Sequence, residues 1–394
     1  KMIIKPKSRG FICTTAHPLG CKKAVENQIK YVKSKPKLEL GKKVLVIGSS
    51  MGYGLSSRIV SAFSSNAATI GVIFDKSPSE NRTASAGWYN TAAFEEFAHG
   101  ENLYAKTING DAYSDEIKQQ VIDLIKKDLG KVDAVIYSLA SPRIVTQDKT
   151  YTSVLKPIGR PFSSKSIDLK TNKITEVTID PATNDEIEDT IKVMGGEDWQ
   201  AWIDALVKAD AIENDAITLA YSYIGPTLTH AIYKDGTIGQ AKNHLYTTAD
   251  VISEKYNSLG IKAYVSVNKA LVTQSSAAIP VVPLYISLLF KTMKEKGTHE
   301  GCIEQMYRLF SSKFQDGNAI VDENGLIRLD DWEMDKSIQR IISKNWGSIN
   351  DENLCELTDL EGFWNDFYAI FGFGIDGVDE NNDVSPLYQI ESLI

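Results

Sequence analysis

Residues 43–54, KVLVIGSSMGYG, join a short apolar run to a glycine-rich turn. The run KVLVIG is typical of a strand that is covered on both faces of a sheet. A helical pattern follows over residues 55–63, and a second apolar run, residues 68–74, ends at Asp75. This order predicts a βαβ unit with the glycine turn at the carboxyl end of its first strand.

The same alternation continues along the chain. Further strands are predicted at 103–108, 132–139, 217–222 and 263–267, and helices at 88–99, 115–129 and 238–257. Strands that alternate with helices indicate an α/β fold with a Rossmann-like, doubly wound parallel sheet, whose ligand crevice lies at the carboxyl ends of the strands. The residues expected at those ends are Gly48, Asp75, Asp111, Ala140, Ser222 and Asn268.

The remaining segments surround this core. A polar helical cap is expected before residue 43, an insertion with a β-hairpin at 143–200, and a helical extension at 291–394. We therefore predict a single domain over residues 1–394, with its core at 43–290.

Composition limits the function classes. The 394 residues are 43% hydrophobic, enough for a large core, and the net charge of −8 disfavours a nucleic-acid binder. The four cysteines are widely spaced and form no C-x-x-C pair, so neither a metal site nor a disulfide framework is expected. With no signal-peptide pattern at the N-terminus, these features favour a cytoplasmic protein.

Residues 270–290 carry no charge over 21 positions, the length of a membrane span. Polar residues and two prolines, Pro280 and Pro283, interrupt this run. We interpret it as a loop followed by a buried helix, which also suits the wall of an apolar pocket.

The turn from Gly48 to Gly54 has the spacing G-x-x-x-G-x-G between a strand and a helix. Glycines at such a turn let the backbone approach a pyrophosphate, which the helix N-terminus stabilises. Asp75, 21 residues beyond Gly54, is placed to bind the adenosine ribose and to repel a 2'-phosphate, which favours NADH over NADPH.

A rival interpretation uses the same residues. Gly48 to Gly52 also satisfies G-x-S-x-G, the nucleophile elbow of α/β hydrolases, with Ser50 as nucleophile. A hydrolase would need a histidine, for which His299 is available. This interpretation assigns no function to Asp75 or Lys242. A nucleotide-binding module without catalysis is a further alternative.

Residues 221–242, YSYIGPTLTHAIYKDGTIGQAK, hold Tyr223, Tyr233 and Lys242. In one continuous helix, Tyr233 and Lys242 would lie about 180° apart. Asp235 and Gly236 disfavour a helix interior, so we expect Tyr233 in a loop and a helix that begins near residue 237. The phenol and the ammonium group can then face one pocket.

Longer motifs carry a resemblance over essentially the whole chain: GSSMGYGLSSRI, TASAGWYN, NGDAYSDE, VIYSLASP, VMGGEDW, AYSYIGP and ALVTQSSAAIPVVPLYIS. With the spacing Y-x8-K, they resemble the FabV and trans-2-enoyl-CoA reductase family, NADH-dependent enzymes that reduce the double bond of 2-enoyl thioesters. The resemblance implies that Tyr233 is the proton donor and Tyr223 a substrate-binding residue, in a monomer whose substrate is carried by acyl carrier protein or coenzyme A.

The resemblance also implies the NADH contacts, which are Gly48, Ser49, Ser50, Met51, Gly52, Tyr53, Phe74, Asp75, Asp111, Ala112, Leu139, Ala140, Lys242, Leu271, Val272 and Thr273. The chain departs from the family at Asp75, where glutamate is usual. The shorter side chain keeps the negative charge, so a preference for NADH is expected to persist.

Overall fold

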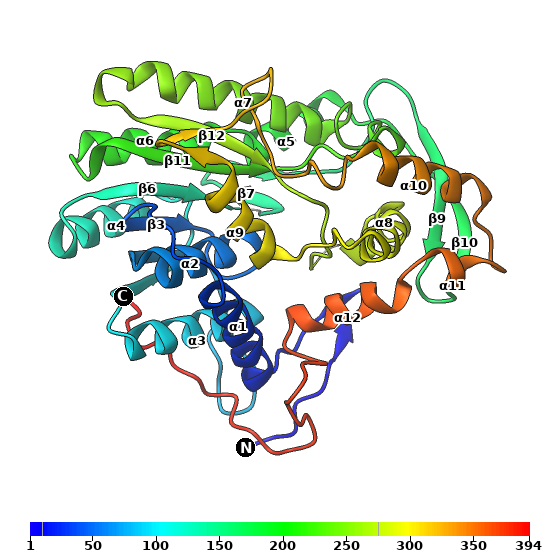
Figure 1. The fold of residues 1–394 in the computed structure, drawn as a ribbon, viewed down its shortest axis with the longest axis horizontal. Coiled ribbons are helices and arrows are strands. Elements are labelled where there is room, and N and C mark those ends of the chain that lie inside the picture. Colours follow the sequence, from blue (N-terminus) through cyan, green and yellow to red (C-terminus); the bar gives the residue numbers. More distant parts are fainter. Residues whose placement is uncertain (10, 140, 275) are drawn as a thin grey trace.

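A seven-stranded parallel sheet forms the centre of the molecule (Figure 1). The computed structural model describes residues 1–394 except 10, 140 and 275. The sheet order is β15-β12-β11-β6-β3-β4-β5, and every pair is parallel. Its strands are β3 (Lys43–Ile47), β4 (Ala68–Ile73), β5 (Ala105–Asn109), β6 (Val132–Tyr137), β11 (Ile212–Ser222), β12 (Lys262–Val267) and β15 (Ile327–Arg328). The predicted doubly wound α/β fold is confirmed.

Helices cover both faces of the sheet. One face packs against α1 (Pro18–Lys33), α2 (Gly52–Ser65), α3 (Ala86–Gly100) and α9 (Cys302–Ser312). The other packs against α4 (Asp115–Asp128), α6 (Glu197–Lys208) and α7 (Thr237–Lys255). This two-sided cover explains why β3 and β4 are apolar runs without alternation.

The strand order reverses next to β3, which pairs with β4 on one side and β6 on the other. A reversal of this kind opens a crevice at the carboxyl ends of the two central strands. The glycine turn follows β3 directly and leads into α2, so it lies at this crevice.

The insertion adds two antiparallel hairpins and one helix. The hairpins are β7 (Arg143–Val145) with β8 (Thr150–Thr152) and β9 (Phe162–Asp168) with β10 (Lys173–Ile179), and the helix is α5 (Asn184–Met194). The β-hairpin expected within 143–200 is thus confirmed. By contrast, α6 belongs to the core, because Trp199 and Trp202 are fully buried against the sheet.

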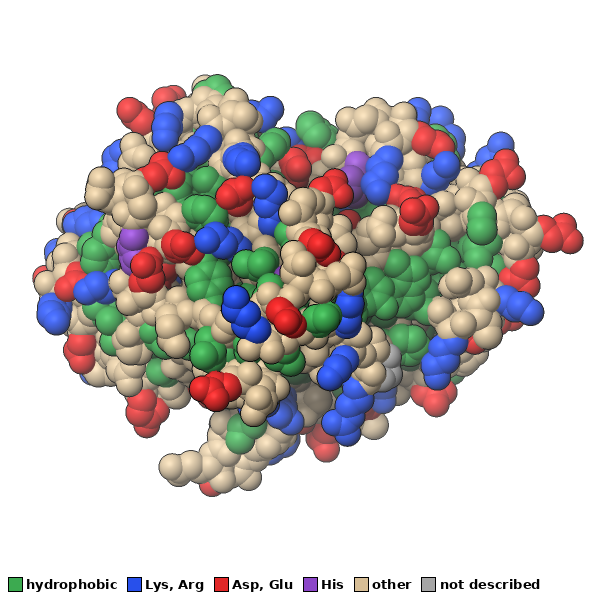
Figure 2. Space-filling model, turned by 90° about the horizontal axis from the view of Figure 1, so that it is seen from below, with side chains coloured by type: hydrophobic (Ala, Val, Ile, Leu, Met, Phe, Trp, Pro, Cys, Tyr) green, Lys and Arg blue, Asp and Glu red, His purple; other side chains and the backbone are tan. Residues whose placement is uncertain are grey.

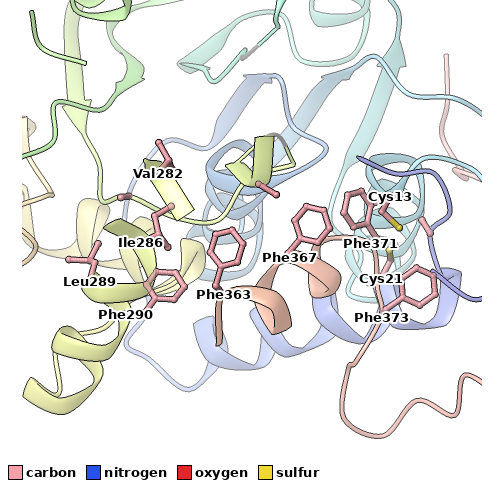
Figure 3. Close-up of a cluster of buried hydrophobic side chains, with 14 of the residues drawn as sticks. Cys13, Cys21, Val282, Ile286, Leu289, Phe290, Phe363, Phe367, Phe371 and Phe373 are labelled. Carbon is pink, nitrogen blue, oxygen red and sulfur yellow. The ribbon is translucent and has the colours of Figure 1, made fainter. Parts of the chain in front are cut away.

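The apolar run 270–290 becomes a loop and the buried helix α8 (Val282–Lys296). Figure 3 shows Val282, Ile286 and Phe290 of α8 in one cluster with Phe363 and Phe367 of α12 (Leu360–Ile370). Among the described residues, none of the helices combines the length and hydropathy needed to cross a membrane.

The C-terminal extension is not purely helical, because it supplies β15 as the seventh strand. Two residues are too few to show a strand period, which is why the sequence pattern did not reveal β15.

The last residues run along the edge of β5, where Thr107 donates its N–H to Ser392 and accepts from the N–H of Ile394. This tail covers an edge strand that would otherwise be open to pairing. The remaining strands and α-helices are β1 (Ser8–Arg9), β2 (Ile12–Cys13), β13 (Phe314–Gln315), β14 (Asn318–Ala319), α10 (Lys336–Ser348) and α11 (Leu354–Leu357).

The surface seen from below carries acidic and basic side chains interspersed, together with a hydrophobic area toward the right of the view (Figure 2). A mixed pattern of this kind gives that face no extended field of one sign.

Candidate active site

The glycine turn is shaped by close backbone contacts. Gly48 has a φ of +81°, and a Cβ there would lie 2.4 Å from the carbonyl oxygen of Ser138. A Cβ at Gly54 would lie 1.9 Å from the carbonyl oxygen of Gly48. Gly52, with a φ of +57°, opens the first turn of α2 to free space. The turn is therefore tight on its protein side and open on the other, which fits a dinucleotide pyrophosphate at the helix N-terminus.

Asp75 follows β4 and lies beside this turn. Its carboxylate accepts a hydrogen bond of 2.7 Å from the Ser85 hydroxyl and another from the Ser50 hydroxyl. Burial raises the pKa of Asp75, and both hydroxyl groups oppose that rise. Phe74 beside it is 75% exposed, so its ring is free for contact with a flat ligand.

Three other predicted cofactor segments lie at the same edge of the sheet. Asp111 and Ala112 follow β5, and the Asp111 carboxylate accepts the N–H of Tyr113 at 3.0 Å. Leu139 follows β6, whereas Ala140 lies outside the described residues. Leu271, Val272 and Thr273 follow β12.

Tyr53 connects the turn to the segment after β12. Its hydroxyl donates to the carbonyl oxygen of Lys269 at 2.8 Å, and the buried ammonium group of Lys269 donates to the Ala270 carbonyl at 3.0 Å. Burial lowers the pKa of Lys269 to about 8. The structure thus fixes two of the predicted cofactor segments relative to each other.

The tyrosine and lysine of the 221–242 stretch take up the expected local structure. Tyr233 lies in a turn, and α7 begins at Thr237, as predicted. The rings of Tyr223 and Tyr233 meet edge to face, with centroids 5.2 Å apart and an interplanar angle of 88°. Lys242 lies in the second turn of α7, and burial lowers its pKa to about 8.

A buried carboxylate, Glu333, completes this arrangement and was missed by sequence reasoning. Its Oε2 accepts hydrogen bonds from the hydroxyls of Tyr223 at 2.9 Å and Tyr285 at 2.6 Å, and Oε1 accepts the N–H of Ala270 at 2.8 Å. The side chain is fully buried. Glu333 sits in the acidic run DDWEMD, where nothing distinguishes it from a surface charge.

Besides burial, the negative charge of Glu333 raises the pKa values of Tyr223 and Tyr233. Burial raises the pKa of Tyr233 first, and the Glu333 charge raises it further. The same two causes raise the pKa of Tyr223. Both phenols therefore keep their protons at neutral pH, which suits a donor and excludes a preformed tyrosinate.

The hydrolase interpretation fails on geometry. A nucleophile elbow holds its serine in a strained turn conformation, but Ser50 is not among the described non-glycine residues with positive φ. Its hydroxyl bonds to Asp75, and none of the hydrogen bonds found for the described residues joins it to a histidine.

Family models match most of the chain. Residues 3–80 match the family model described as the NAD(P)H binding domain of trans-2-enoyl-CoA reductase, residues 82–315 match its catalytic region, and residues 321–384 match an enoyl reductase FAD binding domain. A flavin does not fit the last segment. In this fully described stretch no glycine-rich turn joins a strand to a helix, and Phe363 and Phe367 are packed in the core.

Relatives cover the full length of the chain. It is 55% identical over 394 residues to a trans-2-enoyl-CoA reductase [NADH] of Ruminiclostridium cellulolyticum and 57% identical over 395 residues to an enoyl-[acyl-carrier-protein] reductase [NADH] of Flavobacterium johnsoniae, covering 100% of both chains in each case. The crystal structure of Treponema denticola trans-2-enoyl-CoA reductase in complex with NAD superposes with a TM-score of 0.94 at 49% identity, covering 99% of this chain and 100% of that one. These matches give no support to a hydrolase. The chain belongs to the trans-2-enoyl-CoA reductase family.

Proposed function

We propose that this protein reduces the C2–C3 double bond of trans-2-enoyl thioesters with NADH, as in fatty acid biosynthesis. The observation that carries the proposal is the pair of partly buried tyrosines, Tyr223 and Tyr233, at the carboxyl edge of the sheet that also holds the glycine turn. When bound, NADH supplies the hydride for C3 of the substrate. Turnover of NADH with crotonyl-CoA, compared with NADPH, tests this assignment.

Tyr233 is the proposed catalytic residue. As charge develops on the thioester oxygen, its phenol donates a hydrogen bond to that oxygen and stabilises the enolate. Because the pKa of Tyr233 is raised, the phenol is fully protonated at neutral pH and available as a donor. C2 of the enolate is then protonated with Tyr233 as the proposed proton donor, and a proton from solvent restores the phenol.

Tyr223 is proposed to position the substrate, although its hydroxyl proton is not available to the thioester. Its hydroxyl donates to Glu333, so only the phenol oxygen and the ring remain for contact with the thioester. Glu333 is thus a positioning residue that fixes Tyr223 and, through the edge-to-face contact, Tyr233.

Glu333→Gln is expected to lower kcat about tenfold, because two phenol hydrogen bonds lose their charged acceptor. KM for NADH should stay unchanged, since the amide oxygen of Gln can still accept the N–H of Ala270 and the glycine turn is not touched. Steady-state kinetics measure both quantities, with the exposed Glu352→Gln as control. An unchanged kcat, or an equal loss of NADH affinity, would show that Glu333 has no positioning role.

Lys242 is proposed to hold the nicotinamide ribose and to favour negative charge near Tyr233. Its folded pKa of about 8 lies below the ordinary 10.5, so the ammonium charge is present below pH 8 and is lost as the pH rises through 8. We expect kcat/KM to fall about tenfold per pH unit above that value.

Burial gives Lys269 a pKa of about 8 as well, so the pH dependence alone does not identify the titrating lysine. A variant of Lys242 distinguishes the two. Arginine stays charged above pH 8. The kcat/KM of Lys242→Arg should therefore not fall above pH 8, even if its maximum is lower than that of the wild type. If kcat/KM of the variant falls above pH 8 as in the wild type, the fall comes from the titration of another group.

The remaining cofactor contacts are proposed for the turn residues Gly48, Ser49, Ser50, Met51, Gly52 and Tyr53, and for Phe74, Asp75, Asp111, Ala112, Leu139, Ala140, Leu271, Val272 and Thr273. Asp75 is proposed to set the preference for NADH, since a 2'-phosphate would meet its carboxylate. Equal catalytic efficiency with NADPH would remove that role.

We further propose a monomeric, cytoplasmic enzyme that forms one domain over residues 1–394. All four cysteines are free, and two of them, Cys13 and Cys21, are buried in the core. Unpaired cysteines are usual in a reducing compartment.

A further inference from the structure

A groove lies on the outer side of the segment that carries the two tyrosines. It has a volume of about 880 Å³ and runs between residues 224–234 and residues 323–343, which include the N-terminal half of α10. Gln339 of α10 lines it and donates to the carbonyl oxygen of Glu333 at 2.8 Å, while Glu333 accepts from Tyr223. Hydrogen bonds through Glu333 therefore connect the lining of the groove to Tyr223.

The charge of the groove is opposite to that of the protein. Its lining holds Lys234, Arg328, Lys336 and Arg340 against one carboxylate, Glu323, although the chain as a whole has a net charge of −8. Arg328 is neutralised by ion pairs with two aspartates. Among the described residues, none of the other three cations forms an ion pair, and all three are exposed.

The groove also offers an apolar surface. Ile224, Pro226, Leu228, Leu326 and Met334 line it together with the cations. Apolar side chains beside convergent cations are the combination that binds a flat heterocycle with phosphate groups.

We propose that this groove binds the phosphorylated adenosine end of coenzyme A, with Lys234, Lys336 and Arg340 on its phosphates. The inference rests on the proposed function, because it names the carrier of the enoyl group. The pantetheine arm then leads past residues 224–225 toward Tyr223, and the thioester reaches the phenol pair.

The test compares two substrates that share the acyl group and the thioester. Crotonyl-CoA carries the phosphates, and crotonyl-pantetheine carries none. For Lys336→Glu combined with Arg340→Glu, we expect KM for crotonyl-CoA to rise at least about tenfold, with kcat and the KM for crotonyl-pantetheine unchanged. Lys234→Glu alone should raise KM for crotonyl-CoA about fivefold. Lys127→Glu on the distant helix α4 is the matched control (Figure 1).

Three results would overturn the proposal. The first is an unchanged KM for crotonyl-CoA, or an equal rise for both substrates, which would indicate a general structural effect. The second is a rise confined to crotonyl-[acyl carrier protein], which would assign the cations to a protein carrier. The third is inhibition by free FAD that the double variant abolishes without a change in KM for crotonyl-CoA. A wild-type protein that oxidises NADH with neither crotonyl thioester would instead overturn the proposed function, a result distinct from these three.

Discussion

Tyr233→Phe is expected to lower kcat by about a hundredfold or more with enoyl thioesters. The variant keeps the ring and its edge-to-face contact with Tyr223 but removes the hydroxyl, the only donor proposed for the developing enolate oxygen. Loss of one oxyanion donor or general acid has an effect of about this size. Single-turnover measurement of NADH oxidation with crotonyl-CoA separates this chemical step from product release.

Tyr246→Phe is the matched control for that experiment. Tyr246 lies on α7, close in sequence to Tyr233, and its hydroxyl shares a hydrogen bond of 2.8 Å with Ser222. The control loses a partly buried phenol hydroxyl outside the proposed chemistry, so kcat should stay near the wild-type value. Full activity of Tyr233→Phe would remove Tyr233 from the mechanism.

Gly54→Ala is expected to have the second large effect, on cofactor affinity and on stability together. Its Cβ would lie 1.9 Å from the carbonyl oxygen of Gly48, which is backbone and cannot rotate away. Overpacking of this kind costs about 3 kcal/mol of unfolding free energy. The turn must also shift, so we expect the Kd for NADH to rise at least about tenfold.

Gly100→Ala shows whether these effects belong to the turn. Gly100 is the last residue of α3, and a Cβ there would meet nothing within 4 Å. Chemical denaturation and NADH titration of both variants should give near wild-type values for Gly100→Ala. If Gly54→Ala also binds NADH normally, the turn is not the pyrophosphate site.

The order of the fold could be predicted where the period of hydrophobicity is strong. The strands that begin near residues 43, 68, 132 and 263 are rich in apolar residues because helices cover both faces of the sheet. This pattern is visible in the sequence alone. Gly236 and the residues before it also placed Tyr233 outside α7, because glycine disfavours helix interiors wherever it occurs.

The rest of the site depends on contacts between distant segments. Glu333 lies 110 residues from Tyr223 in the chain, and only the folded structure brings its carboxylate to that phenol. The strand β15 has two residues and gains its pairing from β12 alone. Neither feature has a local pattern, because burial and pairing are decided by the partner and not by neighbouring residues.

Transfer of deuterium tests the central claim most directly. The protein is incubated with NADH that carries deuterium at the transferable C4 position and with crotonyl-CoA, and the product is analysed by mass spectrometry and NMR. The account predicts butyryl-CoA with deuterium at C3 and, in ordinary water, only protium added at C2. Deuterium at C2, or free coenzyme A released without oxidation of NADH, would contradict it.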